Sequence, residues 1–244
     1  MKVLAFDIWG DYAHYKKIYA TTSAVSYCLP PKTSLYGYVG AILGLEKGNN
    51  HYLSYFQNKD CLIGIQLMKP IIMQRLNINL RPCLGWLPLK KDGTHENRKP
   101  TMMEFVYEPK YRIYFFHKDS ELYTHLRESL SEKNAVYTPT MGLADLISNF
   151  EYVGEFEASL IQNLGNPVPI SSVIPKSQFE KFNNAALRNN KTEIIEQSMF
   201  AIEMDVERNV TERDDILLER KTKPIDAFLN QYYELSNGTN ICLF

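Results

Sequence analysis

The chain has 244 residues, of which 45% are hydrophobic and 23% charged, and its formal net charge is −1. This is the composition of an ordinary globular protein, and the length suffices for one elaborated domain or one domain with a large appendage. No apolar run approaches the roughly 20 residues that a membrane-spanning helix needs. The start, MKVLAFDIWGDY, alternates like a strand, and Asp7 interrupts any signal-peptide core. We therefore expect a cytoplasmic protein without membrane contact.

The charges are unevenly distributed along the chain. From Lys69 to Lys118 there are ten Lys and Arg against four acids, whereas Glu193 to Glu219 holds nine acids with only Arg208 and Arg213. The first stretch could contact phosphate groups, while the second would stay solvated or face a basic partner. Random surface patchiness would produce similar windows, so charge alone does not decide between these interpretations.

The four cysteines, Cys28, Cys61, Cys83 and Cys242, do not form a Cys-x-x-Cys pair, and no histidine has a ligand-like spacing from them. Scattered single cysteines in a cytosolic chain are usually small buried hydrophobic residues. We therefore predict no metal site and no cofactor.

Strand-like and helix-like patterns alternate along the first two thirds of the chain. In chain order we expect a strand at Val3–Trp9, a helix from Thr33 to about Leu45, a strand at Leu62–Met68, a strand at Tyr111–Phe116, a helix marked by Leu122, Leu126 and Leu130, and a strand at Glu151–Ala158. Residues 69–110 contain five prolines and little periodicity, so they form a long insertion. The order β-α-β, insertion, β-α-β predicts an α+β protein with the ferredoxin-like split arrangement.

The last third gives weaker patterns. Ser177–Leu187 is predicted to be helical, with Phe179, Phe182 and Ala186 on one face. Near the end, the apolar runs YYEL and NICLF flank Ser236-Asn237-Gly238, and an Asn-Gly pair in that setting predicts a hairpin.

The run PPKTSLYGYVGAILGL, residues 30–45, combines a helix start with glycines. Thr33 is the predicted N-cap, and Lys32 with Ser34 would complete a phosphate site beside the unpaired N–H groups. Gly37, Gly40 and Gly44 share one helix face, which indicates either close packing on a sheet or, at Gly37, close approach of RNA. The run is not a P-loop, because there the Lys-Ser/Thr pair follows the glycines.

Two further segments have side chains suited to single-stranded RNA. In Asp11–Ser26, Lys16 and Lys17 could contact phosphates while Tyr12 or Tyr15 contact bases; the alternative is an amphipathic surface loop. In Met73–Pro82, Gln74, Asn77 and Asn79 offer amides for base edges, and Arg75 and Arg81 flank them; the alternative is an ordinary exposed hairpin.

Residues for catalysis are few. His117 and Lys118, with help from Tyr36, could cleave RNA without metal, but a His-Lys pair after a strand is usually only a strand end. The acids of the 193–219 stretch are mixed with hydrophobic residues and include no histidine, and no nucleophile motif is present. We expect a non-catalytic protein, with a metal-independent endoribonuclease as the alternative and a scaffold without RNA contact as a third class.

Three runs carry a family resemblance: DIWGDYAHYKK, TTSAVSYCLPPKTSLYGYVGAILGL and PTMGLADLISNFEYVGEFE. They resemble the Cas-five family, the small CRISPR-associated subunit of type I interference complexes (Cascade), within the RAMP superfamily. The NICLF ending is most similar to the type I-B branch. The resemblance covers about residues 3–158 and the C-terminus, while residues 160–230 match loosely.

The resemblance implies a role in antiviral defence as the subunit that binds the repeat-derived 5′ handle of the guide CRISPR RNA and caps the complex. It also implies contact with the backbone subunit and with the large PAM-recognising subunit, and proximity to target DNA near the PAM. It assigns residues 1–158 to a ferredoxin-like RNA-binding domain with a β-hairpin thumb at about 69–110, and 159–244 to a β-rich C-terminal extension packed on it.

With the surface at Asp11–Tyr36 implied to cradle the handle, the candidate RNA-binding residues are Tyr12, His14, Lys16, Lys17, Thr22, Ser23, Lys32, Thr33, Ser34, Tyr36, Gly37, Arg75, Asn77 and Arg81. One branch of the family, in type I-C systems, processes precursor RNA with a Tyr, a Lys and a His. Here His117-Lys118 has the reverse order, so that activity is not carried over.

Overall fold

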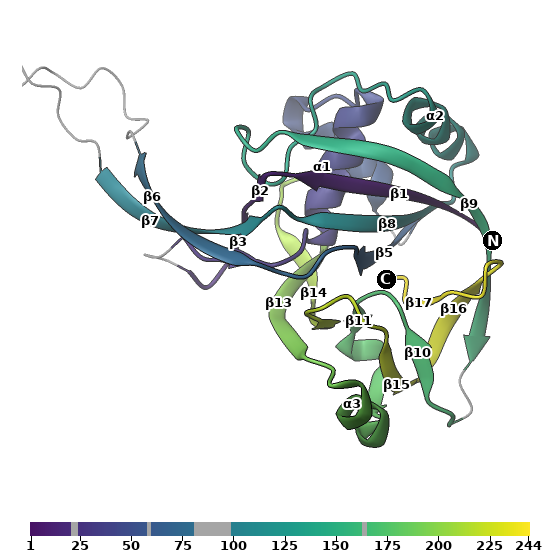
Figure 1. Ribbon diagram of the computed structural model, residues 1–244. Helices are drawn as coiled ribbons and strands as arrows, with labels where there is room; N and C mark the ends of the chain where they lie inside the picture. The colour runs from purple at the N-terminus through teal and green to yellow at the C-terminus, as the bar shows by residue number, and fades with distance from the viewer. Residues whose placement is uncertain (21–23, 58–59, 81–98, 163–164) are drawn as a thin grey trace, which may run out of the picture.

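The computed structural model describes residues 1–20, 24–57, 60–80, 99–162 and 165–244. Within them the chain is an α+β protein, as the sequence predicted, and antiparallel strands predominate (Figure 1). Among the helices of these ranges, none has the length and apolar character needed to cross a membrane.

A six-stranded sheet forms the centre of the molecule. Four of its strands lie in the spatial order β9 (Ser148–Gln162), β1 (Lys2–Gly10), β8 (Lys110–His117) and β5 (Cys61–Leu67), and every neighbouring pair is antiparallel. Helix α1 (Lys32–Leu43) connects β1 to β5, and α2 (Ser120–Ser131) connects β8 to β9. The predicted succession β-α-β, insertion, β-α-β is therefore confirmed.

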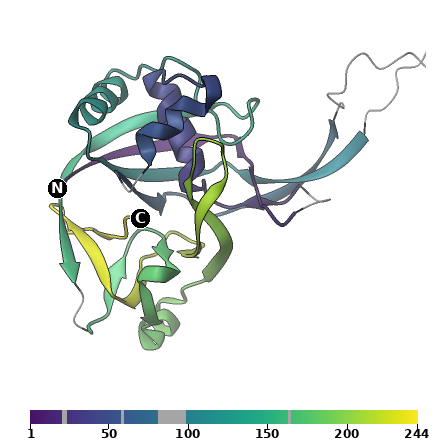
Figure 2. The same ribbon diagram turned by 180° about the vertical axis from the view of Figure 1, so that it is seen from behind.

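Strand β1 shows why the sequence places it at the centre, because its residues from Val3 to Ile8 are all buried. Leu4, Phe6 and Ile8 belong to the main core with α1 and α2, which cover one face of the sheet (Figure 2). Val3 and Ala5 point the other way, into a second core closed by the C-terminal residues. This alternation follows from the two-residue period of a strand whose faces are both covered.

Helix α1 begins differently from the prediction. Its first residue is Lys32, and the N-cap is Pro31, which makes no side-chain capping bond, so the prediction that Thr33 caps the helix is wrong. The Pro31 carbonyl already accepts the N–H groups of Ser34 and Leu35, at 2.8 Å and 3.1 Å. Pro at this place suits a helix start because its φ is fixed near the helical value.

The glycines of α1 do not pack on the sheet, so the first of the two explanations offered for them, close packing on a sheet, is wrong. The sheet-facing residues are apolar, whereas the nearest neighbour outside the helix for a Cβ at Gly40 would be Tyr52, at 3.5 Å. Gly44 ends the helix with a φ of 72°, a left-handed conformation that favours glycine. A Cβ at Gly37 would meet no atom within 4 Å, so this position is open.

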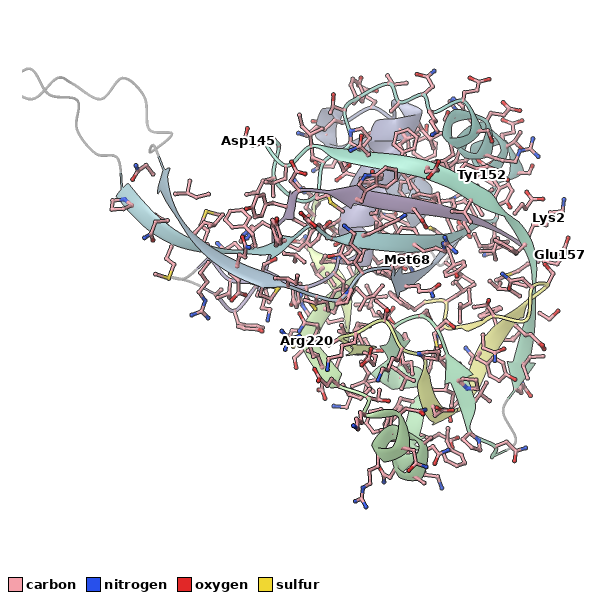
Figure 3. The ribbon with its side chains drawn as sticks, in the orientation of Figure 1. Lys2, Met68, Asp145, Tyr152, Glu157 and Arg220 are labelled. Carbon is pink, nitrogen blue, oxygen red and sulfur yellow. The ribbon has the colours of Figure 1, made fainter. Side chains whose placement is uncertain are left out.

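The insertion contains a two-stranded ribbon that extends away from the body (Figure 1). Strands β6 (Met73–Leu80) and β7 (Lys99–Tyr107) pair antiparallel along their length. At the base of the ribbon, the Ile71 N–H donates to the Arg220 carbonyl at 3.0 Å, and Figure 3 shows Arg220 beside this base. A backbone hydrogen bond thus joins the base of the ribbon to the end of β14 (Val210–Glu219), 149 residues later in the chain.

The rest of the described chain consists mainly of further strands, with a few helical segments. The remaining elements are β2 (Tyr12–Ala13), β3 (Tyr15–Lys16), β4 (Ser26–Tyr27), η1 (Gly48–Phe56), β10 (Val168–Ile170), β11 (Ile174–Pro175), η2 (Lys176–Gln178), β12 (Phe179–Phe182), α3 (Asn184–Asn190), β13 (Ile194–Met204), β14 (Val210–Glu219), β15 (Ile225–Leu229), β16 (Gln231–Leu235) and β17 (Asn240–Ile241). The predicted helix at Ser177–Leu187 is wrong in its first half, because Phe179–Phe182 is a strand paired with β15. The aromatic pair packs as strand neighbours, and the helix starts only at Asn184.

The C-terminal hairpin is confirmed. Strands β16 and β17 pair across the turn, where Gly238 has a φ of 78°, and β16 joins the second half of β9. Strand β9 runs through Ala158, the residue at which the two predicted domains were divided. The last residue, Phe244, exchanges backbone hydrogen bonds with Ile63 of β5.

Three of the cysteines, Cys28, Cys61 and Cys242, are buried and free, as expected of small hydrophobic residues. Cys83 lies outside the described residues.

Candidate nucleic-acid interface

The β6–β7 ribbon sorts its side chains onto two faces. Arg75 stands opposite Glu104, Asn77 opposite Met102 and Asn79 opposite Pro100, so these side chains share one face. Arg75, Asn77, Asn79 and Met102 are all exposed. We call this set, Arg75, Asn77, Asn79 and Met102, the ribbon face. It offers one guanidinium, two amides and a flexible apolar side chain to a partner.

Gln74 was expected to act with these amides, but it lies on the opposite side of the ribbon. Its Oε1 accepts a hydrogen bond from the Tyr12 hydroxyl at 3.3 Å. The alternation of side chains along a strand separates it from Asn77. Tyr12 itself packs against Phe105 and Tyr107, so its ring supports the ribbon.

Arg75 already has an acidic neighbour. Its Nε lies 3.4 Å from Glu104 Oε2, with the Arg75 side chain 67% exposed. The other oxygen of Glu104 accepts the Ser26 N–H at 3.3 Å. Glu104 thus joins the ribbon to β4 and orients Arg75, while an exposed pair of this kind leaves the guanidinium accessible to phosphate.

The predicted RNA-binding residues in the segment after β1 differ in their exposure to solvent. Lys16 is exposed, and Lys17 lies 5.6 Å from the Tyr27 ring centroid and 5.9 Å from that of Tyr19. His14 is buried, and its Nδ1 lies 2.7 Å from the Glu104 carbonyl. Tyr15 is buried as well. The lysines remain candidates for RNA contact, whereas His14 and Tyr15 face the protein interior.

Lys32 and Tyr36 also face inward, which departs from the predicted phosphate site. Lys32 is 1% exposed, and its Nζ lies 2.8 Å from Glu203 Oε1. The Tyr36 hydroxyl donates to the second Glu203 oxygen at 3.0 Å, and its ring stacks on Phe56. Burial raises the pKa of Tyr36 far above its usual value. The physical reason is that Lys32, placed in the first helical turn, points to β13 rather than to solvent.

Thr33, Ser34 and Gly37 line a cleft of about 640 Å³ on the outer side of α1. We call it the α1 cleft; its other walls come from η1, the loop before β9 and the turn between β13 and β14. Those walls contribute two cations, Lys47 and Arg208, and two aromatic rings, Tyr52 and Tyr137. The structure thus brings three predicted residues to one open site.

The predicted residues Thr22, Ser23 and Arg81 lie outside the described residues. The four added cleft residues, Lys47, Tyr52, Tyr137 and Arg208, were not found from the sequence. They come from three separate segments, and only Arg208, one of two cations within an acidic stretch, had a local signal.

His117 and Lys118, the candidates for catalysis, have structural partners. His117 Nδ1 accepts the Asp119 N–H at 3.0 Å, so Nε2 carries the proton and donates to the Tyr55 carbonyl at 2.7 Å. Lys118 pairs with Asp60 at 2.7 Å. In the described ranges no group of three or more His, Cys, Asp or Glu side chains could hold a metal ion.

Sequence comparison finds no matching family model and no matching curated protein. Comparison of the fold gives clear neighbours. A CRISPR protein from Archaeoglobus fulgidus has a TM-score of 0.57 at 12% identity, over 99% of this chain and 98% of that one. This chain has the fold of CRISPR-associated proteins.

Two further structures agree with that conclusion. A Cas protein has a TM-score of 0.50 at 8% identity, over 91% of this chain and 95% of its own. A chain of a CRISPR RNA-guided surveillance complex has a TM-score of 0.50 at 10% identity, over 91% of both chains. The resemblance to CRISPR-associated proteins, first noted in the sequence, is therefore confirmed at the level of the fold.

Proposed function

We propose that this protein is a non-catalytic, Cas-five-like subunit of a type I CRISPR interference complex, and that it binds and caps the 5′ handle of the guide RNA. The observation that carries the proposal is the ribbon face, which presents Arg75, Asn77 and Asn79 to solvent on a strand pair that projects from the body. A guanidinium suits phosphate, and amides suit base edges, which only an unpaired strand presents.

The strand order supports the structural half of this proposal. The order β9-β1-β8-β5, with both helices on one face, is the arrangement that a ferredoxin-like domain would have, and it supports that assignment. The β6–β7 ribbon would then be its thumb, inserted between β5 and β8.

The absence of catalysis is also proposed, on the geometry of the candidate groups. Cleavage without metal needs a base that reaches the 2′-hydroxyl. Both His117 nitrogens are engaged by backbone groups, and the residue is buried. Tyr36 is buried against Glu203, and its raised pKa makes it a poor acid or base near neutral pH. These contacts support a structural role for both His117 and Tyr36.

The alternative is a metal-independent endoribonuclease, and one assay separates the two. The purified full chain is incubated with RNA of the host CRISPR repeat in EDTA, alongside His117→Ala. We expect no discrete cleavage by either protein but retention of the RNA in a gel-shift assay. Cleavage by the native chain that His117→Ala abolishes would replace the capping role by the nuclease.

The proposed partners follow from the same role. In a complex, the chain would contact a backbone subunit and the large PAM-recognising subunit, near the target DNA. Purification of the tagged chain from its host, with sequencing of the accompanying RNA and mass spectrometry of the accompanying proteins, tests this directly. Recovery of the chain without CRISPR RNA would count against the proposal.

A further inference from the structure

The α1 cleft has positively charged side chains in its lining and open space above Gly37 of α1. Its lining includes Lys47 and Arg208, and none of the described residues that line it is acidic. A lining whose only charges are positive favours an anionic ligand. Glu207, next to Arg208, is turned toward its own hairpin, where its Oε2 accepts a hydrogen bond from Asn209 at 3.4 Å.

The turn that carries Arg208 is firmly built. Asp205 accepts the Asn209 N–H at 2.7 Å and the Asn209 side-chain amide at 3.0 Å, and the Arg208 N–H donates to the Asp205 carbonyl at 3.0 Å. Arg208 has a φ of 67°, a conformation that costs a non-glycine residue about 1–2 kcal/mol. Glycine or asparagine would adopt this conformation at lower cost.

Hydrogen bonds fix the walls of the cleft relative to one another. The Asn50 side chain donates to the Val206 carbonyl at 3.1 Å, which joins η1 to the β13–β14 turn. The Tyr137 N–H donates to the Ala41 carbonyl at 2.9 Å, which joins the third wall to α1. The cations and rings are therefore held on a common frame rather than on loose loops.

The floor and the rings suit a flat ligand. Gly37 leaves the helix surface open, since a Cβ there would meet nothing within 4 Å. Tyr52 is partly buried against Gly40, while Tyr137 is 56% exposed and presents its ring at the rim. Aromatic rings beside a cation-lined surface are how proteins hold single nucleotides of an unpaired strand, with the base stacked and the phosphate neutralised.

We propose that the α1 cleft holds one ribonucleotide unit, with its base on the Tyr52 and Tyr137 rings and its phosphate at Lys47 and Arg208. The unit could belong to the bound RNA chain or be a free nucleotide. The case in which the unit belongs to bound RNA rests on the proposed function. In that case the RNA would have a second contact, separate from the ribbon face, where one of its bases is unstacked from its neighbours.

The sharpest variant fills the cleft without disturbing the fold. Gly37→Leu places a side chain in open space and replaces a residue that costs a helix about 1 kcal/mol, so we expect an unchanged or higher Tm. Affinity for a ten-nucleotide oligouridine should fall about fivefold or more, the lower end of what one stacked base contributes. The matched control is Ala185→Leu, an equivalent enlargement at an exposed position of α3, which should change neither quantity.

A second variant removes the charge and keeps the turn. Arg208→Asn retains a residue that accepts a positive φ, so we expect the Tm to hold while RNA affinity falls. Arg188→Asn, at an exposed position of α3, is the charge-matched control. RNA that carries 4-thiouridine should cross-link to Tyr52 or Tyr137, as mapped by mass spectrometry.

The outcomes separate this proposal from the proposed function. If Arg75→Ala weakens RNA binding while Gly37→Leu and Arg208→Asn do not, and the native chain binds no uridine monophosphate, the cleft proposal is overturned and the RNA-binding role stands. If the native chain binds no RNA but binds uridine monophosphate in a manner that Gly37→Leu blocks, the cleft proposal stands with a free nucleotide, and the handle-binding role fails. Binding of neither ligand by the native chain overturns both.

Discussion

Lys32 and Glu203 form an ion pair that is almost fully enclosed by α1 and β13. The Lys32 side chain is 1% exposed and that of Glu203 13%, and the Tyr36 hydroxyl donates to the second carboxylate oxygen. A buried charge is tolerated only with such partners, because water no longer solvates it. The pair therefore fixes where the acidic β13–β14 hairpin packs, and with it one wall of the α1 cleft.

Removal of one partner should be costly. We expect Lys32→Met to lower the free energy of unfolding by about 3–5 kcal/mol, because it leaves the Glu203 carboxylate buried with too few donors. The double variant Lys32→Met/Glu203→Gln should recover much of that loss, as measured by urea denaturation. A loss under about 1 kcal/mol for the single variant would mean that the pair is solvated in the native protein.

Burial also governs the cysteine thiols. It raises the pKa of Cys28 to about 12 and raises the pKa values of Cys61 and Cys242, since the thiolate is disfavoured away from water. The reactive thiolate is thus scarce near pH 8. We expect iodoacetamide to label these three cysteines slowly in the native chain and quickly in urea, as followed by peptide mass spectrometry. Rapid native labelling of Cys28 would show that this part of the core opens readily.

At the scale of elements, the β6–β7 ribbon separates two kinds of contact on one face. Arg75 lies nearest the body and can meet phosphate, whereas Asn77 and Asn79 lie farther along β6 and can meet base edges. Phosphate contacts carry no sequence information, while base-edge contacts do. Replacing Arg75 should therefore change RNA affinity in a different way from replacing Asn77 or Asn79.

Arg75→Ala should weaken binding of cognate handle RNA and of a scrambled RNA alike, and should reduce the log–log salt slope by about 0.7, the value of one phosphate on a single strand. Asn77→Ala should leave the slope unchanged and reduce the preference for the cognate RNA. Arg188→Ala, on the exposed surface of α3, serves as the control. A native affinity that hardly changes with salt would contradict this division of roles.

At the scale of the whole molecule, the two ends of the chain close one core. Val3 and Ala5 of the first strand pack with Ile241 and Leu243, and Phe244 pairs with Ile63. Because β16 and β17 extend the six-stranded sheet that has β1 near its centre, the C-terminal residues take part in the main fold. Loss of packing at the C-terminus should consequently reach the centre of the sheet.

We therefore expect a single cooperative unfolding transition, with the same midpoint by circular dichroism and by tryptophan fluorescence. Leu243→Ala, at a buried position, should lower stability by about 2–5 kcal/mol and shift both midpoints together. Leu160→Ala, at a half-exposed position of β9, is the matched control and should change stability by about 0.5 kcal/mol or less. Two separate transitions would instead support a division near residue 158.

The sequence alone determined the elements whose patterns are local. The alternation in β1, the leucine spacing of α2 and the Asn-Gly hairpin each depend on residues close in the chain, so the main strands and helices could be predicted. The resemblance in the runs around β1, α1 and β9 likewise pointed to a CRISPR-associated fold, which the structural neighbours bear out.

The tertiary structure alone decided which polar residues face solvent. Lys32, His14 and Tyr36 look like RNA ligands in sequence, but partners about 90 to 170 residues away draw them inward. The α1 cleft also depends on segments that are distant in sequence, because Arg208 reaches α1 only through the packing of β13. A side chain's partner and exposure are set by long-range packing, and local sequence carries almost no record of it.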